Sequence, residues 1–369
     1  MHLTLVISSL APGGAERVMS TMANYWVEKG WDITLVTLCD GTGFFYPLDQ
    51  RVKRIALNAA GQSMSVLKAV CNNTRRIVKL RTAIRSSAPD AVISFLDHIN
   101  VLVLLATRGL GVPVVVSERI DPSWHDIGKV WESLRNLAYP WADAVVVQTR
   151  GALTWASSRI SAERSVVIPN PVCLAPSWLG QECGSFSMPF LLAMGRLEEQ
   201  KGFDLLLRAV ARVLPDFPIW SMVILGEGPQ RRELEELARE LGLDGRVQFP
   251  GRHANPIAVM RQAELFVLSS RFEGFPNALC EAMAAGLPAV SFDCPSGPGA
   301  IIRHGVDGIL VRPGDVSGLA AAMRELMAHP ERRKELAARA VDIVERFGLK
   351  KVMSMWEQLL ARLGKSGTR

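Results

Sequence analysis

Short apolar runs that recur along this chain constrain its fold more than any other feature of the sequence. They are rich in Val, Ile and Leu, they are continuous rather than alternating, and stretches with helical spacing separate them. In the first half of the chain the runs are Leu3–Ile7, Ile33–Leu38, Val52–Leu57, Ala91–Phe95, Val114–Ser117, Ala144–Val147 and Ser165–Ile168. A strand that is apolar on both faces needs cover on both, which predicts a parallel sheet between two helical layers.

A proline-rich segment between Pro169 and Pro189 interrupts this series and reads as a linker. The apolar runs then resume at Phe190–Met194, Ser221–Leu225, Val247–Phe249, Leu265–Leu268, Ala289–Phe292 and Ile309–Val311. The pattern predicts two doubly wound α/β domains, residues 1–170 and 189–348, joined by residues 171–188. Ligands of such sheets bind beyond the carboxyl ends of the strands, so the two sets of loops are expected to face a central cleft.

Composition and cysteine usage narrow the class of protein. Hydrophobic residues make up 49% and charged residues 21% of the chain, as in a folded globular protein. The run Leu3–Ile7 is too short for a signal peptide, and no apolar stretch approaches a membrane span. The six cysteines have no disulfide-framework or metal-ligand spacing, which favours free thiols in a reducing compartment. We therefore expect a cytoplasmic protein, either free or held at a membrane from the cytosolic side.

Glycines follow two of the predicted strands, where a phosphate or sugar would approach backbone N–H groups. Gly13 and Gly14 lie between the first strand and a helix, and Gly226 and Gly228 follow the strand Ser221–Leu225. A tight turn with no ligand explains either stretch as well. The spacing is not that of a dinucleotide fingerprint, and no acidic residue ends the second strand, so nicotinamide binding is disfavoured.

Arg196 and Lys201 lie in a loop that follows the strand Phe190–Met194 and opens a helix. A guanidinium and an ammonium in this position would neutralise a diphosphate without a metal ion. Two cations in an ordinary surface loop are the alternative interpretation.

Glu273 and Glu281 form the most specific pattern in the chain. Pro276 and Asn277 suit a helix start, which places Glu273 in a loop and Glu281 about one turn inside the helix. Ionised carboxylates only accept hydrogen bonds, so sugar hydroxyls are fitting partners. The neighbours are apolar and glycine-rich, which disfavours a solvated surface pair.

Taken together, these stretches resemble the family-four retaining glycosyltransferases of GT-B fold. The resemblance rests on the two glutamates with seven residues between them, Gly13-Gly14, Ile168-Pro169-Asn170-Pro171, Gly195-Arg196-Leu197 with Lys201, and Gly226-Glu227-Gly228. These landmarks run in the family's order from residue 8 to residue 281. The resemblance implies that the second domain binds a nucleotide sugar, that the first binds the acceptor, and that a last helix, residues 349–363, packs back on the first.

The resemblance also implies roles for single residues. Arg196 and Lys201 would neutralise the donor diphosphate, Glu281 would bind the ribose hydroxyls, and Glu273 would contact the transferred sugar. The remaining donor contacts would come from Gly251 and Arg252 at the base, and from backbone N–H groups near Asn277, Ala278 and Leu279. Such enzymes usually need no metal or cofactor, in keeping with the absence of an Asp-x-Asp sequence. A front-side mechanism is expected, in which the leaving phosphate helps to accept the proton of the incoming hydroxyl.

The first domain offers candidates for contacts near the reacting sugar. A histidine there often contacts the donor sugar in this family, and Asp97 and His98 follow the strand Ala91–Phe95. His98 serves equally well as a capping or core residue. Glu118 and Arg119 follow the next strand and are our candidates for acceptor binding.

A basic helix is predicted from Ser63 to Ser86. Between Asp49 and Asp90 there is no acidic residue but nine basic ones: Arg51, Lys53, Arg54, Lys68, Arg75, Arg76, Lys79, Arg81 and Arg85. Such a helix suits the anionic cytosolic face of an inner membrane. An ordinary surface helix is the alternative, and nucleic acid is disfavoured because interleaved aromatic residues are missing.

The basic helix and Ser94-Phe95-Leu96-Asp97 are most similar to bacterial transferases that add N-acetylhexosamine to glycans on undecaprenyl diphosphate. This resemblance implies that Arg75, Arg76 and Lys79 contact the lipid-linked acceptor. Three other activities stay open: a sugar-nucleotide epimerase of related fold, a transferase acting on a soluble acceptor, and a non-catalytic glycan-binding protein.

Overall fold

A computed structural model of the chain describes residues 1–39, 45–59, 61, 66–173, 186 and 189–366. The chain forms two compact units. One comprises Met1–Asn170 together with Val352–Arg369, and the other comprises Pro171–Lys351. None of the helices in the described ranges is both long and apolar enough to span a bilayer.

The first unit contains a seven-stranded parallel sheet in the order β3-β2-β1-β4-β5-β6-β7. Its strands are β1 (His2–Ile7), β2 (Asp32–Thr37), β3 (Lys53–Ala56), β4 (Ala91–Phe95), β5 (Val114–Ser117), β6 (Ala144–Val147) and β7 (Ser165–Val167). All seven coincide with predicted apolar runs. The order reverses at β1 and β4, so the loops after these two strands diverge at the carboxyl edge of the sheet.

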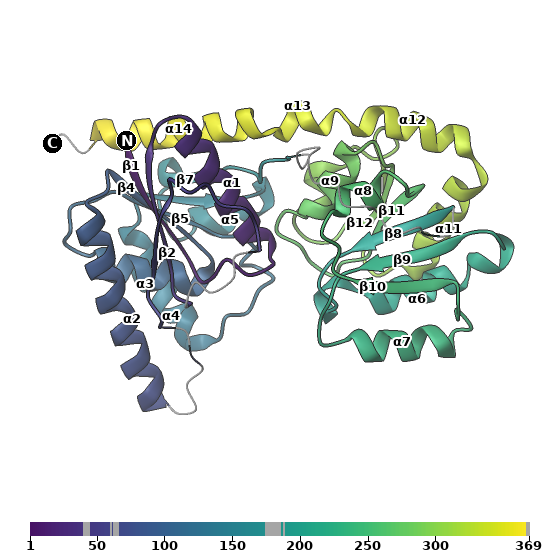
Figure 1. Cartoon of the computed structure of the whole chain (residues 1–369), viewed down its shortest axis with the longest axis horizontal. Coiled ribbons are helices and arrows are strands. Elements are labelled where there is room, and N and C mark those ends of the chain that lie inside the picture. Colours follow the sequence, from purple (N-terminus) through teal and green to yellow (C-terminus); the bar gives the residue numbers. More distant parts are fainter. Residues whose placement is uncertain (40–44, 60, 62–65, 174–185, 187–188, 367–369) are drawn as a thin grey trace. The chain divides into compact units, whose positions relative to one another are not determined.

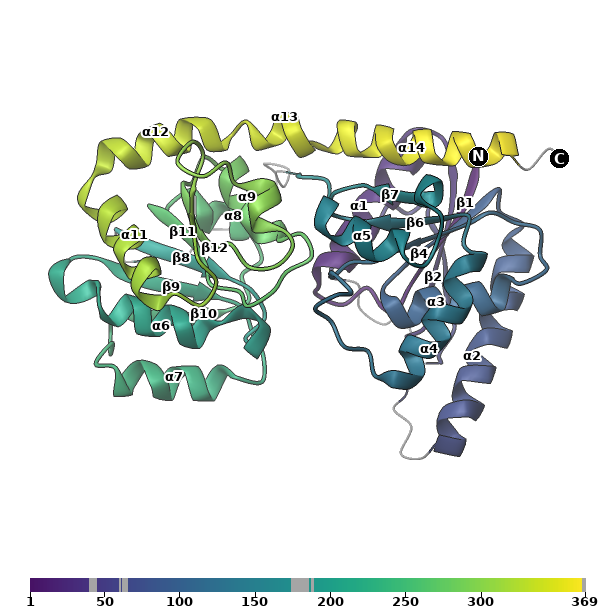
Figure 2. The same ribbon diagram turned by 180° about the vertical axis from the view of Figure 1, so that it is seen from behind.

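Helices cover both faces of this sheet (Figures 1 and 2). One face carries α2 (Val66–Ser87), α3 (Asp97–Thr107), α4 (Lys129–Ala138) and α5 (Arg150–Ser157), which share one apolar core. The other face carries α1 (Gly14–Glu28) and the last part of α14 (Leu349–Ser366). Short 3₁₀ turns η1 (Tyr139–Trp141) and η2 (Ala162–Arg164) follow α4 and α5.

The second unit contains a six-stranded parallel sheet in the order β10-β9-β8-β11-β12-β13. Its strands are β8 (Phe190–Met194), β9 (Ser221–Leu225), β10 (Val247–Gly251), β11 (Leu265–Leu268), β12 (Ala289–Phe292) and β13 (Ile309–Val311). Successive residues of β8 enter two different cores, since Leu191 belongs to one and Leu192 to the other. This explains why the apolar runs are continuous.

Two helical layers enclose the second sheet as well (Figure 1). The core on one face includes residues of α6 (Phe203–Ala211), α7 (Arg231–Glu240) and α11 (Val316–Ala328). The core on the other includes residues of α8 (Pro256–Met260), α9 (Asn277–Ala284), α10 (Pro298–Ile301) and α13 (Ile343–Phe347). The remaining elements are η3 (Glu199–Lys201), η4 (Leu214–Asp216) and α12 (Pro330–Ala340). The predicted GT-B class, two Rossmann-like parallel-sheet domains, is confirmed.

The first unit is completed by a segment distant in sequence. Trp356 of α14 is 1% exposed, and its ring lies 6.2 Å from that of Phe95, at the end of β4. Glu357 pairs with Lys29 at 2.7 Å. Much of the predicted linker, residues 174–185 and 187–188, lies outside the described residues.

Candidate functional site

Lys201 and Glu273 meet at the carboxyl edge of the second sheet. Lys201 ends η3 after β8, and Glu273 follows the adjacent strand β11. Lys201 Nζ donates to Glu273 Oε1 at 2.7 Å, and Ser270 Oγ donates to the same oxygen at 2.6 Å. Their side chains are only 18% and 6% exposed, so the pair is largely shielded from water. Two residues assigned separately from the sequence thus form one charged group.

Backbone contacts fix the loops that carry this pair. Ser269 Oγ donates to the Lys201 carbonyl at 2.9 Å, and Arg271 N donates to the Gln200 carbonyl at 2.8 Å. Gly202 has a φ of +61°, and a Cβ there would lie 2.2 Å from the Ser269 carbonyl oxygen. Only glycine allows this approach, so the Lys201 loop and the Glu273 loop are held as one body.

Arg196 differs from Lys201 in its surroundings. Its side chain is 56% exposed and pairs with Glu198 at 3.2 Å. An exposed guanidinium on a short loop is free to change partner at little cost, because such surface pairs contribute at most about 1 kcal/mol.

Glu281 lies inside α9, which begins at Asn277 as predicted. It is 3% exposed, and Glu273 is 5% exposed, so neither belongs to a solvated face. Asn277 and Ala278 are half-buried at the helix start, whereas Leu279 belongs to the core. Any ligand contact of Leu279 would therefore have to come from its backbone.

The glycines after β9 and in β10 serve close packing between loops. A Cβ on Gly226, whose φ is +140°, would lie 1.8 Å from the Gly195 carbonyl oxygen. A Cβ on Gly228 would lie 2.4 Å from the Leu197 carbonyl oxygen, and one on Gly251 would lie 2.7 Å from Glu227 Oε1. Arg252 is exposed beside them. The loop after β8 therefore packs closely against the loop after β9.

At the start of α1, the turn Gly13-Gly14 accommodates the carboxylate of Glu16. A Cβ on Gly13 would lie 2.1 Å from Glu16 Oε2. The N-cap residue is Gly13, which has no side chain to cap the helix. A glycine is needed here because Glu16 lies over the helix start, where a negative charge is favoured by the helix dipole.

In the first unit, Asp97 binds two imidazoles at the carboxyl edge of its sheet. His98 Nδ1 lies 2.6 Å from Asp97 Oδ1, and His125 Nε2 lies 3.2 Å from Asp97 Oδ2. These hydrogen bonds lower the pKa of Asp97 despite its burial, and the bond to Asp97 raises that of His125. Sequence reasoning found Asp97 and His98 but not His125, which lies in the loop after β5.

The backbone before Asp97 is in an unusual conformation. Leu96, between β4 and α3, has a φ of +78°. Positive φ is an outlier for a bulky side chain, and such residues cluster at ligand sites. Phe95 is fully buried before it, so this turn brings Asp97 to the edge of the sheet.

Glu118 and Arg119 lie in the interior of the first unit, at 4% and 8% exposed. Tyr139 donates its hydroxyl hydrogen to Glu118, and Arg135 Nη1 lies 3.6 Å from the same carboxylate. Burial raises the pKa of Glu118 to about 7, against the opposing influence of Arg135. These contacts suffice to explain Glu118 as part of a buried network, and its acceptor role stays a prediction.

Arg119 contacts neutral groups directly, and the nearby Glu16 carboxylate acts on its charge. It donates to Asn170 and Ser117, and its guanidinium lies 3.9 Å from the Phe95 ring centroid. Burial lowers its pKa to about 9. A direct role of Arg119 in acceptor binding also stays a prediction.

The basic helix is α2, and its cations fall into two groups. Arg76 donates to the carbonyls of Ala59 and Gly61 at 2.8 and 2.7 Å, and Lys79 donates to that of Leu57 at 2.5 Å. Arg75 is exposed instead. Carbonyl oxygens carry no net charge, so these bonds orient Arg76 and Lys79 without cancelling their charge.

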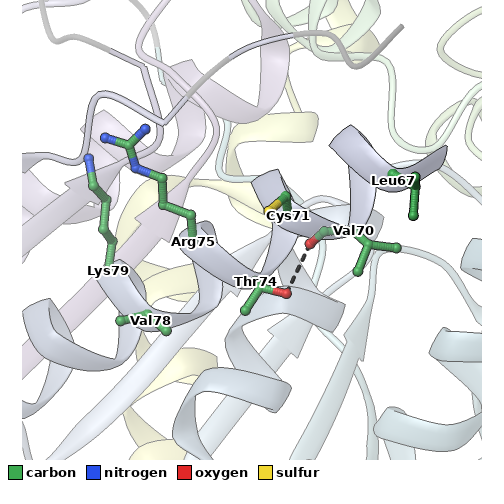
Figure 3. Close-up of a pocket in the computed structure, with 7 residues that line it drawn as sticks. All are labelled: Leu67, Val70, Cys71, Thr74, Arg75, Val78 and Lys79. Atoms are coloured by element: carbon green, nitrogen blue, oxygen red, sulfur yellow. Dashed lines mark hydrogen bonds between the residues drawn. The ribbon is translucent and has the colours of Figure 1, made fainter. Parts of the chain in front are cut away.

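Two apolar stripes run along α2. Leu80 and Ile84 are fully buried against the sheet. Leu67, Val70 and Val78 are 84%, 61% and 58% exposed. This outer stripe lines an open groove together with Cys71, Thr74, Arg75 and Lys79 (Figure 3). Arg75 and Lys79 extend away from Leu67 and Val70, and Val78 lies beside Lys79, so the cations gather toward one end of the groove.

Both units match glycosyltransferase family models. The family model "Glycosyl transferases group 1" matches residues 187–342, and the model "Glycosyl transferase 4-like domain" matches residues 13–171. An α-1,4-N-acetyl-D-galactosaminyltransferase of Campylobacter jejuni, named for an undecaprenol-linked glycan, is 29% identical over 98% of this chain and 99% of its own.

Two further proteins are similar to this chain, one in sequence and one in fold. A second Campylobacter jejuni 4-α-N-acetylgalactosaminyltransferase, named for a diphospho-undecaprenol acceptor, is 28% identical over 90% of this chain and 92% of its own. The crystal structure of Anabaena HepE in complex with UDP superposes with a TM-score of 0.81, at 22% identity, over 98% of this chain and 100% of that one. At that identity the HepE likeness shows the fold alone.

Proposed function

The chain belongs to the group 1 glycosyltransferases, and we propose that it moves a hexose or hexosamine from a nucleotide-diphosphate donor to a polyprenyl-diphosphate-linked glycan. N-Acetylgalactosamine is the sugar we favour. Two relatives that match nearly the whole chain transfer this sugar and are named for undecaprenol-linked acceptors.

The Lys201–Glu273 pair is the observation that carries the donor assignment. Glu273 fixes the Lys201 ammonium at the carboxyl edge of β8 and β11, 2.7 Å from a carboxylate that also accepts from Ser270. Bond cleavage at the sugar places negative charge on the leaving diphosphate. An ammonium already oriented in a shielded site stabilises that charge without reorganisation. Arg196, exposed on the same loop, supplies the second cation once it releases Glu198.

Glu281 and Glu273 hold the donor rather than attack it. Glu281, inside α9, accepts from the ribose hydroxyls, and Glu273 accepts from a hydroxyl of the sugar. Since Lys201 and Arg196 supply the positive charge, the diphosphate leaves without a metal ion. Transfer with retention at the anomeric carbon is what the resemblance to retaining GT-B enzymes implies. The leaving phosphate takes the proton of the acceptor hydroxyl.

The acceptor and membrane assignments rest on α2. Its exposed stripe, Leu67, Val70 and Val78, enters the lipid interface, while Arg75 and the carbonyl-held Arg76 and Lys79 face anionic headgroups or the acceptor diphosphate. The enzyme then works from the cytosolic face of the inner membrane as a peripheral protein.

Replacing Glu281 tests the donor assignment. Glu281→Ala should weaken binding of UDP-N-acetylgalactosamine at least tenfold in calorimetry, because a buried carboxylate that accepts from ribose is removed. Glu236→Ala is a matched control, since Glu236 lies at the surface on α7 of the same unit, half-buried, and pairs with Arg232. Equal donor affinity in wild type and Glu281→Ala would refute the assignment.

A further inference from the structure

His125 is a candidate site residue that no motif in its part of the sequence predicts. It lies eight residues beyond the end of β5, yet its ring reaches Asp97 at the start of α3. The ring is 34% exposed, and that of His98 is 43% exposed, whereas Asp97 is only 15% exposed. The carboxylate is therefore the shielded member, and the two rings are the parts that solvent or a ligand reaches.

Asp97 fixes which nitrogen of each ring faces outward. An ionised carboxylate only accepts hydrogen bonds, so each ring must point an N–H at it. His98 uses Nδ1 and His125 uses Nε2. In a neutral ring this leaves His98 Nε2 and His125 Nδ1 as hydrogen-bond acceptors, whereas protonation, which the raised pKa of His125 favours, makes its Nδ1 a donor. The described residues provide neither nitrogen with a hydrogen-bond partner.

Neighbouring side chains restrict both rings. The His98 ring meets Trp131 of α4 edge to face, with centroids 4.5 Å apart. The strained backbone at Leu96 directs the start of α3, where Asp97 and His98 lie. Fixed rings lose little entropy on binding, which is what a hydroxyl-recognition site needs.

A metal site is the competing interpretation of two histidines around an aspartate. The described residues contain no group of three or more His, Cys, Asp and Glu side chains arranged to hold a metal ion. Moreover, each ring already directs a nitrogen at the carboxylate, so the rings do not converge with it on a common centre.

We propose that His125, oriented by Asp97, is a recognition residue for the glycan acceptor and forms a hydrogen bond with a sugar hydroxyl at Nδ1, beside His98 Nε2. This inference rests on the proposed function, because it takes the acceptor to be a glycan. It adds His125, through Nδ1, to the residues proposed to bind the acceptor. It also assigns Asp97 the role of orienting both imidazole rings.

Two variants of His125 distinguish recognition of the acceptor from a purely structural role beside Asp97. In His125→Gln the amide reaches the Nε2 position, so the hydrogen bond to Asp97 persists while the Nδ1 acceptor is lost. In His125→Asn the amide lies near the Nδ1 position, so the acceptor is kept while the bond to Asp97 is lost. A recognition role predicts that Gln is the more harmful replacement for acceptor use, by roughly tenfold in KM for the acceptor. A supporting role predicts the reverse order.

The experiment uses the full chain with labelled histidine and a soluble α-linked N-acetylgalactosamine disaccharide as the probe. Long-range ¹⁵N–¹H spectra should show His125 Nδ1 shifting on addition of the disaccharide, with an affinity that falls about tenfold in His125→Gln and less in His125→Asn. Thermal unfolding of both variants verifies folding, and UDP affinity should equal that of wild type.

The outcomes distinguish failure of the His125 inference from failure of the proposed function. No response at His125, or equal affinity in wild type and His125→Gln, overturns the inference even where the enzyme transfers sugar. A clear Nδ1 response without transfer of N-acetylgalactosamine to undecaprenyl-diphosphate-linked glycan supports the recognition site and counts against the proposed function.

Discussion

Lys201 Nζ and Glu273 Oε1 lie 2.7 Å apart although 72 positions separate these residues in the sequence. The bond joins the loop after β8 to the loop after β11. It fixes a cation and a carboxylate in one shielded place, and both were assigned to the donor site independently from the sequence.

Removing only one partner of this pair should be costly. Lys201→Met leaves the carboxylate of Glu273 buried with Ser270 as its remaining partner, so we expect a loss of about 2 kcal/mol in the free energy of unfolding. The double variant Lys201→Met with Glu273→Gln should regain much of this stability, because no unpaired charge remains. Transfer should stay at least about a hundredfold below wild type in both variants, since the ammonium is missing.

Chemical denaturation and initial rates on the same preparations provide the measurements. Recovery of activity along with stability in the double variant would show that the pair serves only the fold. A catalytic role of Lys201 therefore requires that the double variant regain stability without regaining activity.

Gly226→Ala should destabilise the second unit by about 3 kcal/mol or more, because the new Cβ meets the Gly195 carbonyl and the φ of +140° is strained. Gly242→Ala is the matched control: its φ is also positive, at +69°, but nothing lies within 4 Å of the new Cβ. We expect the control to cost about 1 kcal/mol. Similar unfolding midpoints for the two variants would contradict the close packing of the loops after β8 and β9.

Glu118 should make stability fall as pH rises. Its pKa is raised to about 7 in the fold from 4.5, so between these values the folded state holds a proton that the unfolded state has released. The contribution of Glu118 is therefore complete below pH 4.5 and is lost as pH rises through 7, by on the order of 3 kcal/mol. The charged or titratable groups that act on it are Arg135, Tyr139, Asp97 and His125.

Glu118→Gln isolates this dependence. Urea unfolding of both proteins at pH 5, 6, 7 and 8 should show wild type losing stability relative to the variant across the series. A constant difference would mean that Arg135 keeps Glu118 ionised throughout.

Charge reversal on α2 tests the membrane assignment. Replacing Arg75, Arg76 and Lys79 by Glu should release the protein from vesicles that contain anionic lipid, since each basic residue near such a surface contributes roughly 1 kcal/mol. Flotation measures the bound fraction. Arg232→Glu on α7, another exposed arginine, is the control and should stay bound. Retention of the triple variant on anionic vesicles would reject α2 as the contact.

Replacing the outer stripe isolates the apolar contribution. Leu67→Ser with Val70→Ser should weaken vesicle binding at high salt more than at low salt, where the cations dominate. The unfolding transition should hardly move, because both side chains are exposed.

The sequence predicted the strands well because a buried parallel strand needs apolar residues on both faces. Each strand therefore appears in the sequence as a continuous apolar run. It also located Glu281, since Pro276 and Asn277 mark the helix start. His125 left no such signal: its role depends on a loop that folds back toward α3, and no local pattern encodes that path. Burial of Glu118 was equally hidden, because it depends on Tyr139 and Arg135, more than fifteen residues away. The glycines after β9 are visible in the sequence, but only the structure shows which carbonyls they approach.

Completion of the first unit by Val352–Arg369 has a consequence for biosynthesis. A ribosome synthesises residues 171–351 before it reaches Trp356, so the first unit depends on a segment that is made after the whole of the second. Until then Phe95 lacks its aromatic partner. The usual amino-to-carboxyl order of domain folding is thus inverted in its last step, and premature termination near residue 350 would leave the first unit with an uncovered core.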